Sequence, residues 1–342
     1  MSFLETVKGN KLVYRTFIKN ATALQIETLA KAMIRQKSTK VTAGLLGVTY
    51  RCQYNCLHCG MGRYGIHRSK EMTLDQMKNA IDQIFDLNVV VLNLVGGEPL
   101  LREDLPQIVE YAASKGMMVK IDTNGFFLDD AKATDLQRAR INNISVSLDA
   151  ADPEKHDTFR GYKGAWEAAV RAIRACVNAG IPVTVGTYAS RANIESDEIP
   201  KVVAMARELG ASGVRVLLPT LSGQWLQSEH ERLTHEEIEK VKTIIDHEFV
   251  YWNMFRKCLC AEKQTFYVSP YGDVQACAFI PISWGNISER PLREILDEIA
   301  AHPLITDVHP AMCIANDPQF REKYTVAIPD NVELPLPISA VS

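Results

Sequence analysis

Short apolar runs alternate with segments of helical periodicity from residue 44 onward. The runs are rich in β-branched residues, whereas the segments between them repeat their apolar positions every three or four residues. We predict strands at 44–50, 89–95, 118–124, 144–150, 182–188 and 214–219, and helices at 73–87, 104–116, 129–139, 164–179 and 196–209. Six such units in succession imply parallel strands with right-handed crossovers. The predicted fold class is therefore α/β, a partial (β/α)6 TIM-like barrel with its chemistry at the carboxyl ends of the strands.

The pattern changes after a helix predicted at 234–247. Residues 264–279 are expected to form a β-hairpin that turns at 270–273, followed by a helix at 292–302. We therefore predict four regions. They are a basic helical segment at 1–43, a barrel core at 44–225, a small hairpin-and-helix module at 226–325 and an irregular proline-rich tail at 326–342.

The composition is that of a globular protein, with 46% hydrophobic and 23% charged residues. No apolar run is long enough to span a membrane, and the first 20 residues lack the apolar core of a signal peptide. A cytoplasmic location is expected. In that compartment the eight cysteines favour metal binding or catalysis over disulfide bonds.

Charge is distributed unevenly along the chain. Residues 1–40 carry a net charge of +6, so the remaining residues carry −9 within a total of −3. One interpretation is a solvated helical face. The other is a basic amphipathic helix around 21–36 that makes a peripheral contact with an anionic lipid surface or an acidic partner.

Three cysteines follow the first predicted strand directly. Cys52, Cys56 and Cys59 have the spacing CxxxCxxC, in a loop where a βα barrel keeps its reactive groups. A structural zinc site requires a fourth Cys or His, and the adjacent His58 would point away from its neighbour's metal. A cubane iron–sulfur cluster fits better, because three thiolates hold three irons and leave the fourth iron open for another ligand.

This arrangement resembles the radical S-adenosylmethionine (radical SAM) enzymes. The resemblance implies that the amino and carboxyl groups of SAM chelate the fourth iron of a [4Fe-4S] cluster, and that a flavodoxin- or ferredoxin-type reductase supplies electrons. Reductive cleavage of SAM then yields a 5′-deoxyadenosyl radical that abstracts hydrogen from a substrate. The GGEP motif of the family matches Gly96, Gly97, Glu98 and Pro99, which the resemblance places on the amino group of SAM.

Further motifs follow the later strands in order. By resemblance, the cofactor pocket or its substrate side also includes Asn124, Ser147, Asp149, Arg160, Arg191 and Val216. Asp149 could instead be a polar strand-end residue that satisfies loop backbone, and Val216 fits equally well as a core residue. The sequence does not identify the catalytic acid, base or hydrogen donor, although Tyr162, Tyr188, His156 and Glu262 are candidates.

A second cysteine group lies in the C-terminal module. The spacing C-x11-G-x4-C from Cys260 to Cys277 resembles the SPASM and twitch extensions of radical SAM enzymes, and Cys258 and Cys313 would complete four ligands. A full SPASM module has further cysteines, so we expect one auxiliary cluster, of the [4Fe-4S] type. A zinc site with the same four cysteines is the alternative. The tight spacing leaves open whether Cys258 and Cys260 both bind, while Cys176 is expected in a helix core.

The leading functional hypothesis is radical modification of a small-molecule biosynthetic substrate, with net oxidation through the auxiliary cluster. About 43 residues precede the first strand, too few for the winged-helix leader-binding domain of many peptide-modifying relatives. The second hypothesis is redox-neutral epimerisation, elimination or adenosylation of a lipid or peptide. The third is a non-enzymatic metal-binding scaffold. No nucleic-acid partner is expected.

Overall fold

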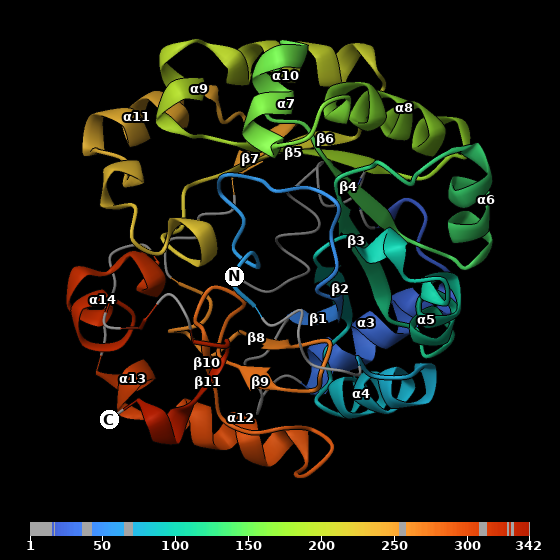
Figure 1. Ribbon diagram of the computed structural model, residues 1–342. Coiled ribbons are helices and arrows are strands. Elements are labelled where there is room, and N and C mark those ends of the chain that lie inside the picture. Colours follow the sequence, from blue (N-terminus) through green and yellow to red (C-terminus); the bar gives the residue numbers. More distant parts are fainter. Residues whose placement is uncertain are drawn as a thin grey trace.

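The centre of the molecule is a curved sheet covered on its outer face by helices (Figure 1). The computed structural model describes residues 16, 18–35, 43–64, 71–252, 258–307, 313–326, 328–329 and 332–341. The sheet has nine strands in the order β7-β6-β5-β4-β3-β2-β1-β8-β9, and β7 and β9 are its edges. The strands are β1 Ala43–Thr49, β2 Val91–Gly96, β3 Met118–Thr123, β4 Asn143–Ser147, β5 Val183–Tyr188, β6 Gly213–Leu217, β7 Val250–Trp252, β8 Thr265–Val268 and β9 Val274–Gln275.

Helices follow the strands, and most of them cover the sheet from outside. They are α4 Leu74–Asp86, α5 Leu105–Ser114, α6 Asp130–Arg138, α7 Pro153–Arg160, α8 Ala165–Asn178, α9 Arg191–Glu195, α10 Glu198–Glu208 and α11 His235–Ile244. Helix α4 begins with the capping box that the sequence contains, in which the side chains of Thr73 and Gln76 each accept a backbone N–H. The predicted α/β class with a partial, TIM-like barrel of parallel strands is confirmed.

Two strands were not expected in this sheet. β7 adds a parallel strand beside β6, and β8 pairs parallel with β1 on the other side, with Ala43 opposite Thr265. The predicted hairpin therefore forms, as β8 and β9, but it extends the barrel sheet rather than standing apart from it. Consequently the hairpin of the C-terminal module lies directly beside the strand that leads into Cys52.

The rest of the C-terminal module surrounds this hairpin, with β10 Ile282–Ser283, α12 Leu292–Ala301, α13 Pro303–Thr306 and α14 Pro318–Tyr324. Gln83 of α4 accepts the backbone N–H of Leu292 at 2.8 Å, which ties α12 to the barrel. The tail was expected to be irregular, but it contributes a two-residue strand, β11 Leu336–Pro337, that pairs with β10. The predicted domain boundaries remain predictions.

The amino ends of the strands are covered by α3 Ala23–Arg35. Its Leu29 and Ala32 pack against Val90 and Met118, and Gln25 donates to the carbonyl of Met117 at 2.8 Å. The apolar face of this helix is therefore used inside the protein. Membrane contact through residues 1–40 stays a prediction, because residues 1–15 and 36–42 lie outside the described part. No helix in the described ranges is long and apolar enough to cross a membrane.

Candidate active site

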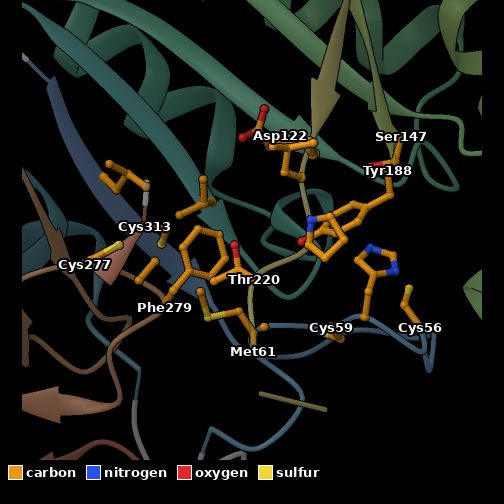
Figure 2. A pocket seen from close by; sticks show the side chains of 18 of the residues that line it. Cys56, Cys59, Met61, Asp122, Ser147, Tyr188, Thr220, Cys277, Phe279 and Cys313 are labelled. Atoms are coloured by element: carbon orange, nitrogen blue, oxygen red, sulfur yellow. The ribbon is translucent and has the colours of Figure 1, made fainter. Parts of the chain in front are cut away.

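One cavity of about 690 Å³ opens at the carboxyl ends of the barrel strands. Both groups of predicted metal ligands line it, namely Cys52, Cys56 and Cys59 together with Cys258, Cys260, Cys277 and Cys313. Figure 2 shows Cys56 and Cys59 on one side of this space and Cys277 and Cys313 on another. Cys176 is fully buried in α8, as expected for a core residue. Tertiary folding thus brings together cysteines that are about 200 positions apart in the sequence.

The two glycines that end β2 allow close approach to the start of the cysteine loop. The N–H of Gly97 donates to the carbonyl of Thr49 at 2.7 Å. A Cβ on Gly97 would lie 2.3 Å from the carbonyl oxygen of Arg51, and a Cβ on Gly96 would lie 2.1 Å from that of Thr49. Because real Cβ atoms do not approach so closely, only glycine fits at either position without a backbone shift. Both glycines also line the cavity.

Helix α7 supports the other side of the cysteine loop. The N–H of Leu57 donates to the carbonyl of Phe159 at 3.1 Å, and the His58 ring stacks on the Phe159 ring with centroids 4.5 Å apart. Gly161 has φ of 60°, and a Cβ there would lie 2.3 Å from the carbonyl oxygen of Asn55. Burial lowers the pKa of His58 to about 3, so its imidazole is neutral at physiological pH. The loop is therefore held between the β2 turn and α7.

Glu98 and Pro99 are buried and do not line the cavity. The Glu98 carboxylate accepts three hydrogen bonds, from Thr123 Oγ1 at 2.6 Å, from the N–H of Asn124 at 2.8 Å and from that of Leu100 at 3.0 Å. Burial raises the pKa of Glu98, and these hydrogen bonds oppose that effect. Glu98 thus joins the end of β2 to the end of β3, whereas Asn124, which it helps to hold, does line the cavity.

A buried ion pair lies below the cysteine loop. Asp149 Oδ2 accepts from Arg160 Nε at 2.6 Å, and Asp149 Oδ1 accepts from the N–H of Tyr188 at 2.8 Å. Arg160 Nη1 lies 3.9 Å from the Sγ atom of Cys56. Burial alone would raise the pKa of Asp149, but the Arg160 guanidinium holds it below its usual range. Arg160 and Ser147 line the cavity; Asp149 does not, and instead orients Arg160 toward it.

Arg191 and Val216 are not brought to the cavity. Arg191 Nε lies 3.0 Å from Glu237 Oε1 and its Nη2 donates to the carbonyl of Arg232, so it bridges α9 and the segment leading into α11. Val216 is fully buried in the core against the helical layer. Its neighbours Arg215 and Leu217 line the cavity instead, because successive side chains of a strand point to opposite faces.

The four C-terminal cysteines come from three separate turns. The Cys258 thiol contacts the thiols of Cys260 and Cys313, and Cys277 follows the hairpin. The hairpin turn depends on Gly272, which has φ of 89°, and on Asn286, which donates to the carbonyl of Tyr271 at 2.9 Å. These contacts explain the C-x11-G-x4-C spacing, because the glycine turn returns Cys277 toward Cys260.

Asn316 ties the Cys313 turn to the barrel. Its Oδ1 accepts the N–H of Leu221 at 2.8 Å, and its Nδ2 donates to the carbonyl of Pro219 at 2.8 Å. Both partners lie just after β6. The fully buried Arg321 continues this attachment by donating to the carbonyls of Leu221 and Leu226. The second cysteine group is therefore docked on the rim of the barrel.

The donor sets fit iron–sulfur clusters. Three thiols in the first group leave one coordination position for another ligand, and four thiols in the second can close every position. Burial raises the pKa of Cys52 and of Cys277 to about 12, so cluster binding must release their protons. Across the described ranges, no three His, Cys, Asp or Glu side chains converge as the ligands of a single metal ion would.

The sequence did not predict that polar residues gather as a group inside the barrel. Asn93, Asp122 and Arg215 line the inner part of the cavity, and Lys120 lies behind them. The signal was available, since each charged residue interrupts an apolar strand at an inward-facing position. Which strands would place these residues side by side could not be read from that pattern alone.

Comparison with known proteins agrees with this geometry. A family described as "Radical SAM superfamily" matches residues 46–218, and one described as "Iron-sulfur cluster-binding domain" matches residues 258–316. An "AdoMet-dependent heme synthase" of Methanosarcina barkeri is 32% identical over 72% of this chain and 80% of the relative. A "PqqA peptide cyclase" of Streptomyces rochei is 30% identical over 73% of this chain and 74% of the relative.

Solved structures show the same fold at low sequence identity. The Streptococcus suis protein SuiB bound to its precursor peptide SuiA superposes with a TM-score of 0.66 at 13% identity, over 85% of this chain and 74% of that chain. The protein anSMEcpe with bound AdoMet superposes with a TM-score of 0.59 at 15% identity, over 78% of this chain and 84% of that chain. These likenesses concern the fold alone.

Proposed function

The chain belongs to the radical SAM superfamily, and on this premise we propose that it oxidises a small-molecule substrate after radical hydrogen abstraction. As a member it is an enzyme that uses SAM, a [4Fe-4S] cluster and an auxiliary iron–sulfur cluster. The observation that carries the proposal is that both cysteine groups line one cavity. A substrate placed there meets the radical and an electron acceptor together.

In this proposal Cys52, Cys56 and Cys59 would hold the first cluster, which would supply the one-electron chemistry for SAM cleavage, with a flavodoxin- or ferredoxin-type protein as the electron source. Gly96 and Gly97 present backbone to the cofactor where no side chain intervenes. The remaining cofactor contacts are proposed for Asn124, Ser147 and Arg160. The buried carboxylates Glu98 and Asp149 hold two of these residues, Asn124 and Arg160, in place.

Cys258, Cys260, Cys277 and Cys313 would hold the auxiliary cluster, which would supply an electron acceptor beside the substrate. Four cysteines leave no position for a substrate ligand, which favours electron transfer over direct substrate binding. Zinc could occupy the same donor set, but the match of residues 258–316 to an iron–sulfur cluster-binding domain favours iron.

For the substrate we propose a carboxylated tetrapyrrole. The cavity volume lies in the range of about 300–1,000 Å³ that is usual for small-molecule sites. The match to the heme synthase covers 80% of that relative's length. An "Fe-coproporphyrin III synthase" of the same organism is 28% identical over 74% of this chain. A peptide is the second candidate, which the peptide cyclase relative favours.

The test uses anaerobically reconstituted protein with dithionite, SAM and Fe-coproporphyrin III deuterated on its carboxyethyl side chains. Deuterium in 5′-deoxyadenosine, together with a substrate product that has lost two electrons, would support the proposal. Deuterium transfer without net oxidation would refute the oxidative course. Absence of SAM cleavage by protein with a full iron content would refute radical chemistry altogether. Turnover of a peptide but not of the tetrapyrrole would favour the second candidate.

A further inference from the structure

The inner wall of the barrel carries a charged cluster formed by Lys120 and Asp122 of β3 and Arg215 of β6. Asp122 Oδ1 lies 3.1 Å from Lys120 Nζ and 2.9 Å from Arg215 Nη2. Asp122 Oδ2 accepts from Asn93 Nδ2 at 3.1 Å, and Arg215 Nη2 also reaches Ser145 Oγ at 3.3 Å. The two cations, Lys120 and Arg215, thus share the single carboxylate of Asp122.

Part of this cluster faces the cavity. Arg215 and Asp122 line it, and the Arg215 side chain is 18% exposed. Lys120 is 7% exposed and lies behind them. Figure 2 shows Asp122 on the part of the wall away from Cys56 and Cys59. The cluster therefore marks the inner end of the space in which a substrate must fit.

The cluster has one positive charge in excess. Two cations face one carboxylate, and the remaining contacts are made by neutral groups. Burial and the neighbouring Arg215 charge lower the pKa of Lys120 to about 8, so the two cations compete for Asp122. Arg215 Nε is a buried donor without a hydrogen-bond partner in the described structure. An excess buried positive charge is costly, and an anion in the cavity would balance it.

We propose that Arg215 binds a carboxylate group of the substrate at the inner end of the cavity; this inference rests on the function proposed above. A guanidinium offers a planar pair of donors that matches a carboxylate, and Asp122 orients it by holding Nη2. An added carboxylate makes the cluster neutral. A substrate anchored at this end extends toward the cysteines, so the inner contact sets which of its atoms the radical reaches.

A purely structural ion pair would not need this arrangement. Such a pair is balanced in charge and turned away from the cavity, as the pair of Arg102 and Asp104 is. Removal of Arg215 would leave Lys120 and Asp122 as a balanced pair, so Arg215→Met is expected to fold. Arg215→Lys keeps the charge but removes the two-pronged donor. Arg138→Met is the matched control, because Arg138 is an exposed arginine on α6.

The first experiment measures carboxylate binding on the reconstituted holoenzyme with SAM bound. Thermal melting is followed in sodium acetate and in sodium chloride of equal ionic strength. Relative to chloride, acetate is expected to raise the melting temperature of wild type and of Arg138→Met, and this increase should saturate. Acetate should raise the melting temperature of Arg215→Met no more than chloride does. Arg215→Lys should show an intermediate increase. An equal effect of acetate on wild type and Arg215→Met would overturn the proposal.

The second experiment asks whether the carboxylate belongs to a tetrapyrrole. Titration with Fe-coproporphyrin III, followed by its Soret absorbance, is expected to show about ten- to a hundredfold weaker binding to Arg215→Met, as for loss of one charge-assisted hydrogen-bonded group. The tetramethyl ester is expected to bind wild type and variant equally weakly. If acetate stabilises wild type selectively but Fe-coproporphyrin III does not bind, the carboxylate site stands and the tetrapyrrole substrate is refuted. If Arg215→Met loses SAM affinity to the same extent, Arg215 serves the cofactor and the inference is refuted.

Discussion

Replacement of Asp149 by asparagine tests how the cysteine loop and the cofactor pocket are held together. Asp149 is fully buried and accepts from Arg160 Nε and from the N–H of Tyr188. Asparagine has the same size but carries one acceptor and one donor at its end. If its oxygen accepts from Tyr188, its amide group faces the Arg160 guanidinium. The variant therefore contains a buried cation without a counterion beside Cys56.

The cost follows from the burial of both partners. Removing one partner of a buried ion pair destabilises a protein by about 3–5 kcal/mol. With an entropy of unfolding of about 2.1 cal/mol/K per residue, a chain of 342 residues should melt about 4–7 °C lower. Because the pKa of Asp149 is held below its unfolded value, its stabilising contribution is present above about pH 4 and is lost as the pH falls below that. The difference between wild type and variant should therefore narrow in acid.

The assay is anaerobic thermal melting at neutral pH, combined with iron analysis and SAM titration. Asp130→Asn is the matched control, because this carboxylate is exposed on α6, and its melting temperature should be unchanged. The double variant Asp149→Asn/Arg160→Met should recover part of the lost stability, since the unpaired cation is gone, without recovering SAM affinity. An Asp149→Asn protein that melts within 1 °C of wild type and binds SAM equally well would refute the reasoning.

Three further variants address other contacts of the site. Cys277→Ala should lose about four irons per chain and form no oxidised product while still cleaving SAM. Cys176→Ala is the control. An equal iron content of the two variants would contradict the assignment of Cys277 as a ligand. Gly97→Ala should lower the free energy of unfolding by about 1–3 kcal/mol, because its Cβ would lie 2.3 Å from a backbone oxygen. Gly186→Ala is the control, because its Cβ would have an ordinary contact at 3.4 Å, and urea unfolding compares the two variants. Asn316→Ala should melt about 1–4 °C lower and retain less auxiliary iron after gel filtration, and full retention would show that Asn316 does not dock the module.

Residues whose role depends on their spacing from near neighbours in the chain could be identified from the sequence. The cysteine triplet after β1, the glycine pair after β2 and the Gly272 turn depend on near neighbours in the chain, and the structure places all of them at the cavity or at its support. Strand and helix positions were predicted for the same reason, because alternation and helical periodicity are local patterns. The seventh parallel strand, β7, has only three residues and carried too short a pattern.

Residues whose role depends on which face they present were harder to assign. Glu98 and Asp149 were expected in the pocket, but each points into the protein and holds a neighbour that does line the cavity. Val216 was expected beside the cofactor, and the strand instead turns Arg215 inward. A shift of one residue along a strand exchanges its two faces, so a motif match cannot by itself separate a binding residue from its support.

The sequence by itself determined the barrel class, the superfamily and the two sets of cysteines, because each is encoded by periodicity or by spacing within a short stretch. Only the tertiary structure decided how these parts meet. The pairing of β8 with β1 and the contacts of Asn316 bring the second cysteine group to the same cavity as the first. Curvature of the sheet brings Lys120, Asp122 and Arg215 together across strands. Such contacts join residues far apart in the chain, and they arise from packing, which no local pattern records.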